Sequence, residues 1–155
     1  MTGQEAVRSQ YLAALKMLKE AIVKCPPRLW NAAADKDKAW AKAYHAVYWA
    51  HKYLQPRRSD FVRWEGHTME NGGVPISKQE LLKYLGFVEL QVIERVGDTD
   101  FQADSGFRGF DMNKLEFHIN NIRHIQQHTG ELYERLGTRA HARLAWSERV
   151  HGRTR

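Results

Sequence analysis

Residues 120–132 read NNIRHIQQHTGEL, and they place His124 and His128 four positions apart in a segment with helical periodicity. Each residue turns an α-helix by about 100°, so the two imidazoles share one face. Side chains at this spacing can both present a ring nitrogen to a single divalent ion. The stretch therefore predicts a long helix that carries part of a metal site, with a further ligand from another segment.

The helix around this stretch is expected to run from about Asn113 to Leu136 and to end before Gly137. Its main apolar stripe consists of Leu115, Ile119, Ile122, Ile125, Leu132 and Leu136. A second stripe on its shoulder consists of Phe117, Asn121, His124, His128 and Glu131. A shoulder position predicts a cleft at the edge of a bundle, where the core shields an ion that keeps an open coordination position.

Three further segments have helical periodicity and are bounded by residues that start or end helices. They are Val7 to Ile22, stopped by Pro26-Pro27; about Asp37 to Leu54, ending before Pro56; and a helix from the capping box Ser77-Lys78-Gln79-Glu80 to Gly97-Asp98. The apolar face of this last helix consists of Leu81, Leu82, Leu85, Val88, Val92, Ile93 and Val96. Arg57 to Pro75 lacks periodicity and predicts a long loop, and Ala140 to Arg149 predicts a short extra helix.

Four amphipathic helices in 155 residues predict an all-α fold, because a four-helix bundle buries their apolar stripes together. A chain of this length is expected to form one domain over residues 1–155. Its 43% hydrophobic and 27% charged residues are typical of a folded soluble protein.

Cys25 is the single cysteine, so the chain cannot form an internal disulfide, and we expect a reducing compartment, the cytoplasm. The apolar segment from Tyr11 to Val23 is interrupted by Lys16, Lys19 and Glu20, which argues against a membrane span or a signal peptide. The formal charge is +6, but the basic residues are scattered, so a nucleic-acid partner is not expected.

The candidate for the third metal ligand is His45, in an aromatic-rich segment that reads AYHAVYW over residues 43–49. This segment and residues 121–132 closely resemble the second-helix and fourth-helix signatures of the DinB-like (DinB/YfiT) superfamily, and the order of elements agrees. The resemblance implies that His45, His124 and His128 bind a divalent metal, zinc or nickel. It also implies an up-down-down-up bundle with a long crossover, and a homodimer. Glu131 and Gln127 depart from the family pattern, which more often has glutamine and histidine there.

The other singled-out residues have plainer interpretations. His51 is expected to be a hydrogen-bonded, partly buried imidazole, and His118 lies about 120° around the helix from His124, too far to join the same ion. Glu131 is expected to orient a histidine ring, to act as a base, or to form a surface salt bridge. Cys25 is expected to pack at a helix end rather than to act as a nucleophile. His67, His141 and His151 are expected to be loop or solvent-facing residues.

Three classes of function follow from this interpretation. The first is thiol transfer to a small-molecule electrophile, as in the family's bacillithiol, mycothiol and glutathione S-transferases, with Arg57, Arg58 or Arg63 binding the carboxylates of a low-molecular-weight thiol co-substrate. The second is metal-dependent hydrolysis, in which Glu131 moves protons. The third is a metal-binding or stress-response protein without turnover.

Overall fold

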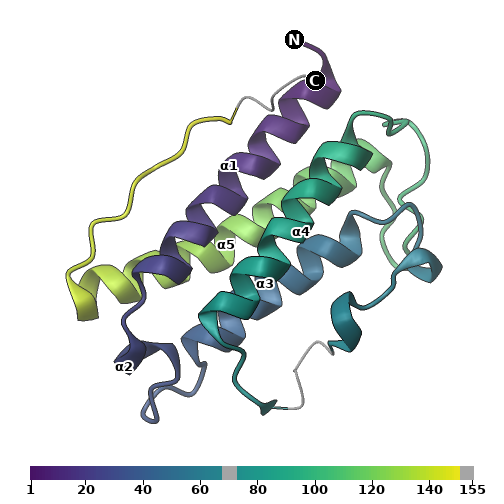
Figure 1. Cartoon of the computed structure of the whole chain (residues 1–155). Helices are drawn as coiled ribbons and strands as arrows, with labels where there is room; N and C mark the ends of the chain where they lie inside the picture. The colour runs from purple at the N-terminus through teal and green to yellow at the C-terminus, as the bar shows by residue number, and fades with distance from the viewer. Residues whose placement is uncertain (68–72, 151–155) are drawn as a thin grey trace.

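The structure is a computed structural model that describes residues 1–67 and 73–150, and in these residues it contains helices and no strand. The helices are α1 (Gly3–Lys24), α2 (Pro27–Trp30), α3 (Ala39–Tyr53), α4 (Lys78–Val96) and α5 (Lys114–Ala140). Two short 3-10 turns, η1 (Arg58–Asp60) and η2 (Trp64–Gly66), lie between α3 and α4. The four long helices pack beside one another (Figure 1), so the predicted all-helical fold is confirmed.

The helix ends follow local sequence signals in most places. α1 starts at a capping box, in which Thr2 and Glu5 exchange hydrogen bonds, and it stops at Lys24, just before the proline pair. α4 starts where the Ser77 hydroxyl accepts a hydrogen bond from the Glu80 amide at 3.1 Å. The predicted return bond from Glu80 is not formed, because its carboxylate lies 3.1 Å from Nε2 of His67 instead. The one-turn helix α2 begins at the second proline, Pro27, and contains Trp30.

Hydrogen bonds between segments fix where the helices begin. α3 begins beside the end of α1, where the Trp40 indole donates to Asn31 Oδ1 at 3.0 Å. α4 begins near the same place, because the Trp30 indole donates to the carbonyl of Ile76 at 2.8 Å. α5 begins near the start of α1, where Tyr11 and His118 share a hydrogen bond of 2.9 Å. A long connection over residues 54–77 therefore separates α3 from α4.

The core between the helices is rich in aromatic side chains. Its largest fully buried residues include Tyr11, Tyr44, Tyr84 and Phe117. Burial of such apolar surface stabilises the fold by roughly 25 cal/mol per Å². None of the helices in the described part of the chain is both long and apolar enough to cross a bilayer.

The inward face of α5 differs from the apolar stripe predicted from sequence. Ile119 is 47% exposed, whereas Asn121 and Thr129 are fully buried. Each of these two side chains donates a hydrogen bond: the Asn121 amide donates to the carbonyl of Ala50, and the Thr129 hydroxyl donates to that of Ile125. Hydrogen bonding offsets the cost of burying a polar group. A prediction from hydropathy alone therefore placed the buried face of α5 incorrectly.

The end of α5 and the residues after it also differ from prediction. Gly137 lies inside the helix, which ends where His141 adopts a left-handed conformation with φ of 51°. The predicted helix from Ala140 to Arg149 is wrong, because residues 142–150 run back along α1 as an irregular segment (Figure 1). Two contacts hold this segment in place. The Ala145 amide donates to the Glu20 carboxylate, and the Tyr133 hydroxyl donates to the Ala145 carbonyl.

Candidate metal centre

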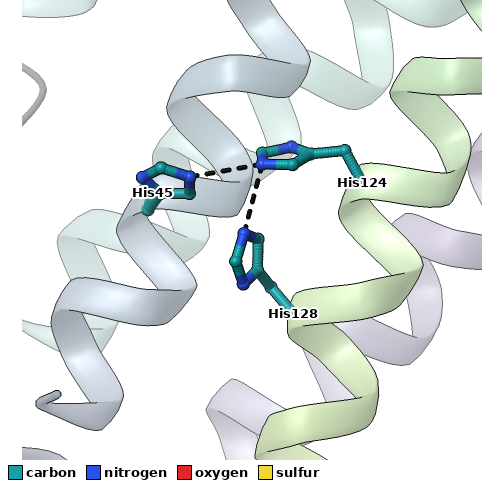
Figure 2. Close-up of side chains that lie close together, drawn as sticks. All are labelled: His45, His124 and His128. Carbon is teal, nitrogen blue, oxygen red and sulfur yellow. Dashed lines mark hydrogen bonds between the residues drawn. The ribbon is translucent and has the colours of Figure 1, made fainter.

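Three histidine rings from two helices converge on one point at the α3–α5 contact. His45 extends from α3, and His124 and His128 extend from adjacent turns of α5 (Figure 2). Nε2 of His124 lies 3.2 Å from Nε2 of His45 and 3.1 Å from Nε2 of His128. The structure thus brings together the three residues that were selected from sequence.

The spacing of these nitrogens fits one small divalent ion. A tetrahedral zinc ion with Zn–N bonds of about 2.0–2.1 Å separates its nitrogen ligands by about 3.3 Å. The two measured separations are within a few tenths of an ångström of that value. One ligand atom from each ring lies within 4.8 Å of the other two, so the set has the geometry of a metal-binding group.

The surroundings of His45 and His124 favour the neutral imidazole, which is the form that binds metals. Burial lowers the pKa of His45 to about 4, and the nearby charges of His128 and Lys42 act in the same direction. Burial likewise lowers the pKa of His124 to about 4, with His128 and His45 adding to the effect. An ion that binds near neutral pH therefore displaces no proton from an imidazolium at these two rings.

Glu131 orients one ring of the cluster. Its Oε2 lies 3.2 Å from Nδ1 of His128, so the N–H at Nδ1 donates to the carboxylate and Nε2 is left to face the other rings. The same carboxylate is paired with the amine of Lys42 on α3. Although partial burial opposes the shift, hydrogen bonds from Lys42 and His128 lower the pKa of Glu131 to about 2. Two of the expected roles, ring orientation and salt bridge, therefore occur together.

A pocket adjoins the cluster on its His124 side. It has a volume of about 290 Å³ and is lined by Tyr53, Asn120, Arg123, His124 and Gln127. The guanidinium of Arg123 has no ion-pair partner among residues 1–67 and 73–150, so it can bind an anionic group there. The prediction that Arg57, Arg58 or Arg63 supplies this charge is not supported, because none of them lines the pocket and Arg57 pairs with Asp60.

Two residues beside the cluster were not predicted from sequence, although each had a signal. Lys42 precedes His45 by three positions and so shares its helix face, but its partner Glu131 is 89 positions away in sequence. Arg123 is the immediate neighbour of His124, and its side chain lines the same pocket. The packing of α3 on α5 brings Lys42 to Glu131.

The histidines outside the cluster occupy several environments. His51 is buried and shares a 2.9 Å hydrogen bond with the Tyr84 hydroxyl, as expected, and His118 is buried against Tyr11. His141 is exposed, and His151 lies outside the described residues. His67 lies in the connection before α4 as expected, but its side chain is only 10% exposed.

Cys25 is buried at the end of α1, in agreement with the expected packing role. Burial raises the pKa of its thiol, although the charges of Lys78, Arg135 and Arg28 oppose the shift. A thiol in this state is a poor nucleophile.

Comparisons of the chain with protein-family models, with curated proteins and with solved structures found no match. The geometry of the three rings and of the adjoining pocket therefore carries the functional proposal.

Proposed function

We propose that the chain binds one divalent ion, zinc or nickel, through His45, His124 and His128, and that it transfers a low-molecular-weight thiol to a small electrophile. The observation that carries this proposal is the convergence of three Nε2 atoms at 3.1 and 3.2 Å beside an open pocket. Three protein ligands are typical of catalytic sites, since they leave one coordination position for a water or substrate. Structural sites are usually closed by a fourth protein ligand.

The residues around the cluster have separate tasks in this proposal. A divalent ion with an open position favours the thiolate form of a bound thiol. Glu131 fixes the tautomer and orientation of His128, and Lys42 holds Glu131 in place. Arg123 binds a carboxylate of the thiol co-substrate as a charge-assisted pair. The overall reaction forms a carbon–sulfur bond, releases the electrophile's leaving group with its electron pair, and gives the thiol proton to solvent.

Hydrolysis is the weaker candidate, because the proposed base is committed to other contacts. Glu131 is paired with Lys42 and His128, which lower its pKa to about 2. A carboxylate with so low a pKa accepts a proton poorly near neutral pH.

We also propose that the chain is a DinB-like protein with the up-down-down-up helix order of that superfamily. Two observations support this order. α3 and α4 both start beside the end of α1, and α5 starts near the start of α1. The long connection between α3 and α4 supports the expected crossover. A homodimer in the cytoplasm is part of the same proposal, and the single buried cysteine supports a reducing compartment.

The proposal is tested by a conjugation assay with monochlorobimane and a panel of thiols that includes bacillithiol, mycothiol and glutathione. The zinc-loaded or nickel-loaded protein is expected to accelerate conjugation with at least one thiol, and His124→Ala is expected to lose the acceleration. Arg123→Gln is expected to raise KM for the thiol, whereas the control Arg108→Gln, an exposed arginine on another cavity, is expected to leave it unchanged. Equal rates for wild type and His124→Ala with every thiol would refute thiol transfer, and ester hydrolysis without thiol would favour the hydrolase.

A further inference from the structure

We propose that Glu65, His67 and Glu80 form a second divalent-cation site, separate from the three-histidine cluster. The site lies where the connection after α3 meets the first turn of α4. One ligand atom from each of the three side chains lies within 4.8 Å of the other two. None of these residues has a task in the proposed thiol transfer.

The histidine of this group is held in place by aromatic packing. Its ring centroid lies 5.3 Å from that of Trp64, 5.9 Å from that of Tyr44 and 6.4 Å from that of Tyr84. The His67 side chain is therefore nine-tenths buried, although it belongs to a loop. A ring fixed before binding loses little conformational freedom when an ion arrives.

One nitrogen of this ring faces a carboxylate of the group, and the other is buried without a partner in the described part of the chain. Nε2 lies 3.1 Å from Glu80 Oε1, so the ring already points toward a carboxylate of the group. Nδ1 is buried and has no hydrogen-bond partner among the residues that the structure describes. Buried polar atoms without a partner are uncommon in folded proteins and often indicate an absent ion or water.

The two carboxylates would attract a cation between them. Glu65 is exposed and the Glu80 side chain is 44% exposed, and their ligand atoms lie within the same 4.8 Å. Like charges at this distance repel, and a divalent cation turns the repulsion into attraction. The positive end of the α4 dipole opposes a cation at this position, and the two carboxylates outweigh that partial charge.

The ligand set indicates which ions fit the site. Two carboxylates and one imidazole suit hard or borderline divalent ions such as Mn²⁺, Fe²⁺ and Zn²⁺. A cation bound there would join the 3-10 turn η2 to the start of α4 and so fasten the connection to the bundle. We infer a structural rather than a catalytic role for this ion.

The test is a Mn²⁺ titration followed by electron paramagnetic resonance, in which bound Mn²⁺ lowers the signal of the free ion. It uses the full chain with His128→Ala, so that the three-histidine cluster does not contribute. About one Mn²⁺ per chain is expected, and Glu80→Gln or Glu65→Gln added to this background is expected to abolish the binding. The wild-type chain preloaded with one equivalent of Zn²⁺ is expected to bind Mn²⁺ as the His128→Ala chain does.

The control variant is Glu116→Gln, which is matched to Glu80→Gln. Glu116 occupies the same place in the first turn of α5 as Glu80 does in α4, since its amide donates to the capping side chain of Asn113. This variant removes the same helix-start charge and is expected to keep the Mn²⁺. Absence of Mn²⁺ binding in the His128→Ala chain, or equal binding in the Glu80→Gln and Glu116→Gln chains, would overturn the second site. Either outcome leaves the three-histidine cluster and its proposed activity untouched.

Discussion

Glu131 Oε2 lies 3.2 Å from Nδ1 of His128, and the same carboxylate binds Lys42 on the facing helix. This relationship turns Nε2 of His128 toward His124, because the other ring nitrogen is already engaged. A contact between α3 and α5 thus fixes the orientation of a proposed metal ligand.

The first prediction concerns this contact. Glu131→Ala is expected to weaken zinc binding by about 10-fold to 100-fold, the usual effect of losing a group that orients a ligating histidine. Glu131→Gln retains an acceptor for the Nδ1 proton and is expected to recover most of the loss. Competition with a zinc-binding dye measures the affinities. The control is Glu134→Ala, an exposed residue on the next turn of α5, and an equal loss there would contradict the role of Glu131.

The second prediction concerns acid stability. Burial lowers the pKa of His51 and of His118 to about 4, below the unfolded value of about 6.5. The unfolded chain therefore binds more protons between these values, so the free energy of unfolding is largest above about pH 6.5 and falls as the pH drops toward about 4. The loss is on the order of 3 kcal/mol per histidine.

Urea unfolding of the metal-free protein over this pH range measures the effect. His118→Gln is expected to show a shallower pH dependence than wild type, because one of the buried histidines is gone. The exposed residue His141 provides the control, and His141→Gln is expected to follow the wild-type curve. A stability that does not change between about pH 6.5 and about 4 would refute the assignment of neutral buried histidines.

The third prediction separates the buried face of α4 from its exposed edge. Leu85 is fully buried, whereas Ile93, assigned to the same apolar face from sequence, is 41% exposed. Leu85→Ala is expected to cost about 2–5 kcal/mol of unfolding free energy, because it leaves a cavity in the core. Ile93→Ala is expected to cost well under half of that. Chemical denaturation measures both variants, and similar costs would contradict the observed orientation of α4.

The fourth prediction concerns the segment after α5. A stop codon in place of Ala142 is expected to leave the helical circular-dichroism signal per molecule unchanged, because residues 142–150 contain no helix. The unfolding free energy is expected to fall modestly, since the bonds of Ala145 to Glu20 and Tyr133 are lost. If the truncation instead lowered the molar ellipticity by the amount that two or three helical turns contribute, the helix expected from sequence over residues 140–149 would be supported.

The parts of the fold that depend on neighbouring residues could be predicted from sequence. The proline pair after Cys25 stops α1, and the Ser77 hydroxyl caps α4. Both signals act within one turn of the chain and do not depend on the rest of the fold. The spacing of His124 and His128 is equally local, since one helix carries both rings.

The parts that depend on distant partners could not be predicted in the same way. Lys114 is 8% exposed because its amine donates to the carbonyls of Gln55 and Pro56, which lie nearly 60 positions away. Gly137 continues α5, because the left-handed residue that ends the helix is His141. The sequence identified residues able to end a helix or to face water, but long-range contacts decided which of them do so.

The most direct test of the account is X-ray absorption at the zinc edge of the Glu80→Gln protein, in which the three-histidine cluster is measured alone. The account predicts three imidazole nitrogens at about 2.0–2.1 Å and one further light ligand. His45→Ala, which removes the ring contributed by α3, is expected to lose one imidazole from the spectrum or to lose the zinc. A spectrum with fewer than three imidazoles, or one that His45→Ala leaves unchanged, would contradict a shared ion at this cluster.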